Sequence, residues 1–292
     1  MIKVSIIMAT YNRGYIIGRA IESVLNQTHK DFELLIIDDG STDNTQEVVK
    51  RYPDSRIRYE WFEHRGFPSA RNQGLSLITG EYITYLDSDS SWRPEFLEVM
   101  IKTLNELPEI EMVYCTYEVI YQILRDGEWQ NVNKAVKRNS YDYKKLLRAN
   151  FIELCAALHR KGCLERIGKF DERLDCLVDW DFLIRLGNEY KVGFIDRLMV
   201  SSYYREGGDN ITFTADPLPS NLLIMEKIRK MGYPIYTLLV EEFTNGSYLA
   251  YLPGFEGYKG IGRSREEAIK DIERSLKENP LSKYIELVML NR

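Results

Sequence analysis

The sequence predicts an α/β protein in which a mostly parallel sheet carries helices on both faces, followed by a small C-terminal β-β-β-α domain. Over residues 1–100, short apolar runs rich in β-branched residues alternate with apolar residues at helical spacing. The segments between them are short and polar, which is typical of strands joined by helical crossovers. From residue 236 on, a hairpin signal and a capped amphipathic helix replace this alternation.

Each element of the first part follows from local signals. The expected strands are the apolar runs 4–9, 32–37, 57–61 and 82–86. The expected helices lie at 16–25, 44–49, 69–77 and 94–104. Asn44 followed by Glu47 is a capping pair, Gly80 marks a helix end, and Pro94 suits a first helical turn. In such a fold, ligands bind at the carboxyl ends of the strands.

The elements beyond residue 110 are less regular. We expect a strand or strand pair at 112–123, a helix from 181, a mobile polar loop starting at 207–210, and a helix at 222–231. The tail contains strands at 236–243, 247–252 and 258–262. Asn245-Gly246 is a turn signal between the first two, and a capping box at Ser264 begins the final helix. We therefore divide the chain into domains 1–235 and 236–292.

The composition excludes several classes of protein. The 292 residues carry 39 Lys and Arg against 44 Asp and Glu, so a nucleic-acid-binding surface is not expected. The four cysteines form no CxxC pair and only three histidines occur, which argues against a zinc site or a disulfide framework. No apolar run is long enough to span a membrane, and the start does not resemble a signal peptide. We expect the protein to lie in the cytoplasm, either free or at the membrane surface.

Carboxylates gather where the expected strands end. Asp38 and Asp39 follow the strand at 32–37, and Asp87 and Asp89 follow the strand at 82–86. Several unpaired carboxylates at one sheet edge cost free energy, so a cation is their natural partner. Oxygen ligands suit Mg²⁺ or Mn²⁺. Taken alone, however, the Asp-Ser-Asp pattern is more often a pair of loop or cap carboxylates. Asp38 has a similar alternative interpretation, as a helix-cap or turn carboxylate.

These strand ends belong to segments that resemble glycosyltransferase family 2, whose members are inverting enzymes with the GT-A fold. The resemblance implies that the α/β sheet is a Rossmann-like mixed sheet. The matching segments are VSIIMATYNR, the run from Gln27 to Thr45, ARNQG and YITYLDSDS, and the likeness spans about residues 3–215. The resemblance implies a nucleotide-diphosphate donor, with UDP favoured. The nucleotide-binding residues that it implies are Thr10, Tyr11, Asn12, Asp39, Arg71, Asp87 and Arg205.

The resemblance also implies a role for each of these residues. Tyr11 and its two neighbours flank the base, and Asp39 accepts a hydrogen bond from a base N–H such as that of uracil. Arg71 approaches the diphosphate. Asp89 binds the Mg²⁺ or Mn²⁺ cofactor, and Asp87 touches the ribose or a metal-bound water, so both count as metal residues. Among the 20 tyrosines, we place Tyr11 and Tyr204 at the site.

On the acceptor side, two further segments match the family pattern. The run 168–174 resembles its GxFDE element and places Asp171 near the acceptor. The run 177–186 resembles its Glu-Asp helix start, with Val178 in place of the Glu. The Asp that acts as general base is retained as Asp179. Trp180 has two interpretations, an acceptor platform or a core residue, and Asp181 is expected to be a helix N-terminal carboxylate.

Tyr204-Arg205 resembles the Tyr-Arg element that occurs late in the sequences of this family. Arg205 is expected to clamp the diphosphate when the following loop closes. Many relatives carry a histidine nearby, where this chain has Glu206-Gly207-Gly208.

The expected reaction is transfer of a sugar to a hydroxyl of a glycan, a lipid-linked acceptor or another molecule, with inversion. The alternative is a regulatory nucleotide-sugar-binding protein whose tail docks a partner. A nucleotidyltransferase would need a Gly- and Lys-rich loop near the N-terminus, which ATYNRGY is not.

The tail, about 236–280, resembles the HicB-like antitoxin domain. The likeness rests on the hairpin that ends in YLAYLP, the glycine-bearing strand after it, and SREEAI before the helix. A shared fold does not transfer its function. We favour self-association or docking of a partner protein over binding of a toxin.

Overall fold

The computed structural model describes residues 3–207, 215–233, 235–253, 258–277 and 286–290. The chain divides into two compact units, 1–215 and 216–292. Helix α9 (Pro217–Lys230) belongs to the second unit, whereas the sequence-based boundary at 235/236 assigns it to the first domain and stays a prediction. Most of the loop expected at 207–210 lies outside the described residues. Within the described residues, every helix is too short or too polar to cross a lipid bilayer.

The first unit is built on one mixed sheet. Its strands, in spatial order, are β3 (Ile57–Trp61), β2 (Phe32–Asp38), β1 (Val4–Thr10), β4 (Tyr82–Tyr85), β8 (Ala157–Arg160), β6 (Ile110–Arg125), β9 (Lys191–Arg205) and β5 (Ser90–Trp92), and β7 (Glu128–Lys137) pairs with β6. The strands β3, β2, β1 and β4 run parallel, as predicted. The short strands β8 and β5 and the hairpin partner β7 are antiparallel to their neighbours, so the sheet is mixed, as the family resemblance implies.

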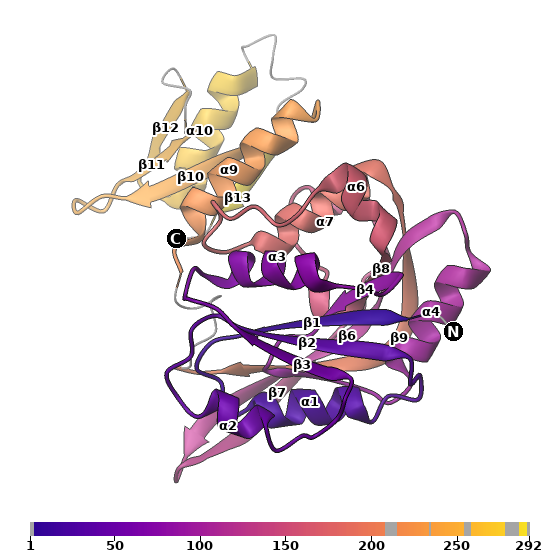
Figure 1. The fold of residues 1–292 in the computed structure, drawn as a ribbon. Helices are drawn as coiled ribbons and strands as arrows, with labels where there is room; N and C mark the ends of the chain where they lie inside the picture. Colours follow the sequence, from indigo (N-terminus) through magenta and orange to yellow (C-terminus); the bar gives the residue numbers. More distant parts are fainter. Residues whose placement is uncertain (1–2, 208–214, 234, 254–257, 278–285, 291–292) are drawn as a thin grey trace. The chain divides into compact units, whose positions relative to one another are not determined.

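Helices cover both faces of this sheet (Figure 1). On one face, α1 (Ile17–Leu25), α2 (Thr45–Val49) and α4 (Phe96–Glu106) bury the core with the inward side chains of β1 and β2. On the other face lie α3 (Phe67–Leu77) and α7 (Val178–Glu189). Gly74 allows α3 to approach the sheet closely, since an added Cβ would lie 2.7 Å from Ile7 Cγ2. The described part of this unit also contains the short helices α5 (Tyr143–Leu146) and α6 (Leu164–Ile167) and the 3₁₀ turns 154–156 and 161–163.

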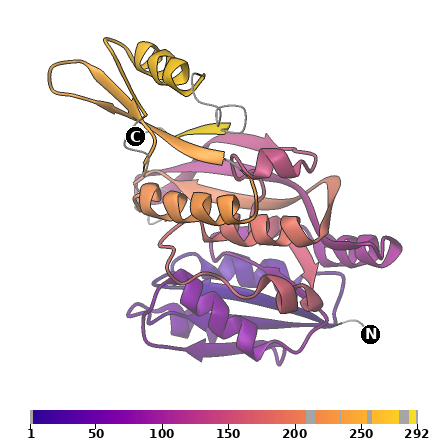
Figure 2. The ribbon, with the colours of Figure 1, turned by 90° about the horizontal axis from the view of Figure 1, so that it is seen from above.

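The second unit contains the expected β-β-β-α order. Strands β10 (Ile235–Glu242), β11 (Tyr248–Tyr251) and β12 (Lys259–Gly262) are antiparallel, and α10 (Arg265–Lys277) packs on them through Ala268 and Ile272. Figure 2 shows α10 in yellow beside the orange strands. A fourth strand, β13 (Glu286–Leu290), pairs in parallel with β10 and was not predicted. Gly260 lets α10 approach β12, because an added Cβ would lie 2.2 Å from Ala268 O.

Candidate active site

A cavity of about 690 Å³ opens at the carboxyl ends of β1, β2 and β4. The predicted site residues that line it are Thr10, Tyr11, Asn12, Asp39, Asp87, Asp89, Asp179 and Tyr204. Segments far apart in sequence therefore meet at one sheet edge, as the strand-end argument predicts.

Arg71 joins two of the predicted carboxylates. It extends from α3, is only 1% exposed, and its Nη2 lies 3.0 Å from Asp87 Oδ1. Its Nη1 donates a hydrogen bond to Asp179 Oδ1. Burial raises the pKa of Asp179, and the Arg71 charge opposes that rise. In this structure the Arg71 guanidinium bridges Asp87 and Asp179, and its approach to a diphosphate stays a prediction.

Asp179 is positioned by the start of α7. Leu177, just before that helix, has a φ of 59°, an uncommon left-handed conformation for a residue with a Cβ. Nearby, the side-chain Nδ2 of Asn72 donates to Phe170 O and to Glu172 Oε1, at 3.0 and 2.7 Å. The Phe170 N–H donates back to Asn72 Oδ1. The ARN segment thus ties α3 to the chain that leads into α7.

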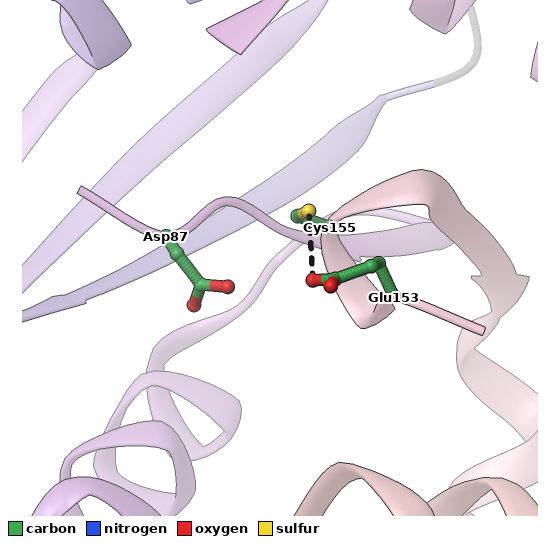
Figure 3. A group of neighbouring side chains, drawn as sticks. All are labelled: Asp87, Glu153 and Cys155. Atoms are coloured by element: carbon green, nitrogen blue, oxygen red, sulfur yellow. Dashed lines mark hydrogen bonds between the residues drawn. The ribbon is translucent and has the colours of Figure 1, made fainter. Parts of the chain in front are cut away.

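Glu153 lines the same cavity and was not predicted. Its Oε1 accepts a hydrogen bond from the Tyr204 hydroxyl at 3.1 Å. Figure 3 shows it beside Asp87 and Cys155, and the ligand atoms of these three residues lie within 4.8 Å of one another. Burial, and after it the charge of Asp87, raises the pKa of Glu153 to about 8. This carboxyl group therefore holds a proton at neutral pH.

Asp39 lies at the side of the cavity where the base was expected. It is 3% exposed, and its carboxylate accepts the backbone N–H groups of Arg65 and Gly66, each at 2.9 Å. The His64 ring stacks on Tyr11 beside it. Thr10 Oγ1 is buried and finds no hydrogen-bond partner among the described residues.

Asp38 and Asn12 hold the backbone around this region. Asp38 accepts hydrogen bonds from Ser41 N and from the Tyr59 hydroxyl, so the structure favours the turn-carboxylate alternative. Asn12 Oδ1 accepts the Thr42 N–H at 2.8 Å and so ties the loop after β1 to the loop after β2.

Arginines surround Asp89. The Oδ2 atom of Asp89 lies 3.7 Å from Arg13 Nη1 and 4.0 Å from Arg205 Nη1. Arg205 is 1% exposed and is not among the residues that line the cavity. Positive charge is thus available next to the carboxylate that was predicted to bind a metal.

The acceptor-side residues are placed differently. Trp180 is buried, and its indole N–H donates to Leu146 O at 2.6 Å, which favours the core interpretation. Asp171 pairs with Arg173 at 2.6 Å. Neither residue lines the cavity; of the GxFDE segment it is Glu172 that does. Asp181 pairs with Arg185 on α7 at 2.8 Å.

The cavity is rich in acidic groups. Its lining carboxylates are Asp39, Asp87, Asp89, Glu172, Asp175 and Asp179, beside the protonated carboxyl group of Glu153. The arginines of the lining are Arg13 and Arg65. The raised pKa values of Glu153 and Asp179 reflect burial, to which the nearby Asp87 charge adds. Hard oxygen donors in such an excess of negative charge fit a divalent cation.

The sequence and the fold were compared with known proteins. The profile described as glycosyl transferase family 2 matches residues 5–167. An uncharacterised glycosyltransferase of Rickettsia typhi is 31% identical over 201 residues, which cover 68% of this chain and 63% of that protein. The Escherichia coli protein WfgD, named UDP-Glc:alpha-D-GlcNAc-diphosphoundecaprenol beta-1,3-glucosyltransferase, is 38% identical over 50% of this chain and 55% of its own length. The chain thus spans less than two thirds of either relative.

Two solved structures share the fold. Staphylococcus aureus TarS 1-349 in complex with UDP-GlcNAc aligns with a TM-score of 0.63 and 19% identity, over 78% of this chain and 66% of that chain. The mannosyltransferase PcManGT from Pyrobaculum calidifontis, in complex with GDP-Man and Mn²⁺, aligns with a TM-score of 0.52 and 22% identity, over 70% and 56% of the two chains. At these identities they support the GT-A fold alone. Since the family profile covers more than half of its residues, the chain belongs to glycosyltransferase family 2.

Proposed function

We propose that this protein transfers a sugar from a UDP-linked donor to an acceptor hydroxyl, with inversion at the anomeric carbon. One observation carries the proposal: Asp39, Asp87, Asp89 and Asp179 line a single cavity at the carboxyl ends of parallel strands. The UDP-glucose in the name of WfgD and the UDP-GlcNAc bound to TarS support UDP as the nucleotide.

The base-binding end of the cavity is formed by Thr10, Tyr11 and Asp39. Tyr11 is 43% exposed and offers a flat ring for stacking. The buried Asp39 carboxylate is an acceptor for the N3–H of uracil. Thr10 Oγ1 lacks a hydrogen-bond partner among the described residues, so it is available to the nucleoside.

Asp89 and Asp87 are the residues that we propose hold Mg²⁺ or Mn²⁺. The excess of lining carboxylates supports this, as does the Mn²⁺ in the PcManGT complex. A bound divalent cation neutralises the charge that develops on a leaving diphosphate. Arg205 and Arg13, next to Asp89, are placed to add positive charge on the same side.

Asp179 is our proposed general base. Its raised pKa makes its carboxylate a stronger base than an ordinary aspartate, and Arg71 holds one of its oxygens in place. Attack by the deprotonated hydroxyl from this side, opposite the leaving diphosphate, inverts the anomeric centre. We propose a glycan, a lipid-linked sugar or another hydroxyl compound as acceptor. The location that we propose is the cytoplasm, with the protein either free or at the membrane surface.

A panel of nucleotide sugars tests this proposal. Thermal unfolding is measured with each compound, with and without Mn²⁺, and each compound that stabilises the protein is then assayed for release of its nucleotide. We expect UDP-sugars to raise the Tm only with Mn²⁺, and Asp89→Ala to remove that rise. Glu109→Ala, which deletes a surface carboxylate outside the cavity, is the control and should keep it. A panel with no stabilising nucleotide would contradict the proposal.

We further propose that residues 236–292 form a HicB-like domain that mediates self-association or docks a partner protein. The order β10-β11-β12-α10 supports it. Two large apolar side chains of this unit, Phe243 and Ile261, are 47% and 66% exposed, which is compatible with a protein-binding face.

A further inference from the structure

His64 makes an aromatic stack at the base-binding end of the cavity. Its ring centroid lies 4.3 Å from that of Tyr11, with an angle of 26° between the planes. Both residues line the cavity, and the His64 side chain is 55% exposed. The two rings are thus in direct contact at a position open to solvent.

The same imidazole donates a hydrogen bond to Asp39. His64 Nδ1 lies 2.8 Å from Asp39 Oδ2 and 2.9 Å from Asp39 O. Both of these oxygens are acceptors, so Nδ1 is assigned as the protonated nitrogen. The adjacent N–H groups of Arg65 and Gly66 also donate to this carboxylate, which fixes the backbone of the loop independently of the histidine ring.

These contacts match those assigned to the donor base under the proposed function. A uracil would place a flat ring on Tyr11 and direct an N–H at Asp39, and His64 does both. A third ring does not fit between two rings whose centroids are 4.3 Å apart. The base and the imidazole therefore exclude one another from the face of Tyr11 on which His64 lies.

We propose that His64 occupies the nucleobase position in the empty protein and that the donor base displaces it. The inference rests on the proposed function, because it takes Tyr11 and Asp39 as the base site. Displacement requires rotation of the His64 side chain alone, since the Arg65 and Gly66 amides keep the loop on Asp39. His64 thus lowers the affinity for nucleotides by competing for their contacts.

The affinity for UDP in the presence of Mn²⁺ tests this competition. Isothermal titration calorimetry compares wild type with His64→Ala, with Tyr11→Ala, and with His29→Ala as the control, because His29 lies outside the cavity. We expect His64→Ala to bind UDP roughly threefold to tenfold more tightly, which corresponds to the loss of one competing aromatic stack. Tyr11→Ala should bind UDP more weakly, and His29→Ala should match wild type.

A structural readout accompanies the affinities. The nuclear Overhauser contact between the Tyr11 and His64 rings should be present in the empty protein and disappear when UDP is added. UDP binding that is unchanged or weaker in His64→Ala, or a ring contact that persists with UDP, would overturn the inference and leave the proposed function standing. If wild type does not bind UDP at all, the proposed function and the inference fail together.

Discussion

Replacing Arg71 by Met should destabilise the protein in a way that depends on pH. The guanidinium is 1% exposed and bridges Asp87 and Asp179, whose side chains are only 30% and 27% exposed. Met keeps the apolar contact with Phe67, whose ring lies 3.9 Å from the guanidinium carbon, and removes the charge. Breaking a buried ion pair by removing one partner costs about 3–5 kcal/mol.

We expect a loss of about 3 kcal/mol, the lower end of that range, because the two carboxylates keep some contact with water. For a unit of this size, that loss lowers the Tm by roughly 6–12 °C. Differential scanning calorimetry or thermal circular dichroism at pH 8 measures it.

The pH dependence has a defined sign. Burial already raises the folded-state pKa of Asp179, and without the opposing charge of Arg71 this pKa rises further. A group with a raised folded pKa loses its stabilising contribution as the pH increases, so the Tm deficit of Arg71→Met should be smaller at pH 5 than at pH 8. Adding Asp179→Asn to Arg71→Met should restore part of the Tm at pH 8, because one of the two stranded charges is gone. A variant as stable as wild type, or a deficit unaffected by pH and by Asp179→Asn, would contradict the bridging role of Arg71.

Three further predictions concern other residues. The folded pKa of Glu153, about 8, lies above its usual 4.5, so this group loses its contribution to stability as the pH rises between those values. Glu153→Gln cannot ionise, so the Tm of this variant relative to wild type should increase from pH 5 to pH 8.5. A Tm difference that is constant with pH would refute the assignment. Asn72→Ala leaves backbone groups of Phe170 without partners and should cost about 2–3 kcal/mol in chemical denaturation; a loss below about 0.5 kcal/mol would be inconsistent with the clamp. If the tail mediates self-association, Ile261→Asp in the full chain should shift the species seen by light scattering toward monomer, whereas an unchanged oligomer would exclude that face.

Much of the fold follows from local sequence. The strands β1, β2 and β4 are apolar runs that end in polar residues, and their parallel pairing follows from the helices between them. The strands β5 and β8 have three and four residues, too short to show a period, and their antiparallel pairing depends on contacts far along the chain. The turn Asp126-Gly127, with φ of 51° and 81°, joins β6 to β7, and it is a hairpin signal that could have predicted that pair.

The part of the site that could be predicted from the sequence is the part formed by residues at strand ends. Tyr11, Asp39, Asp87 and Asp89 follow strands, so the topology brings them together. Glu153 was missed because its partners are remote: Tyr204 is 51 residues away. The one local signal is a single acidic residue within the apolar run 151–157, FIELCAA.

The contacts of Arg71 within the protein could not be predicted from the sequence for a related reason. A motif identifies the residue type that a site needs, but the choice of partner is made by tertiary contacts. In this chain those contacts place the buried Arg71 guanidinium between Asp87 and Asp179. Trp180 is likewise buried by tertiary contacts, and its indole N–H finds its acceptor, Leu146 O, on another helix.

The role of Asp179 is tested most directly by measuring binding and turnover in the same variant. Asp179→Asn is compared with wild type and with Asp126→Asn, a matched change in the β6–β7 turn, for UDP affinity with Mn²⁺ and for release of UDP from the best donor of the panel. The proposed base predicts UDP affinity within about threefold of wild type and a rate of UDP release lower by about 10²–10⁴. Release at the wild-type rate by Asp179→Asn would show that this carboxylate does not take the acceptor proton.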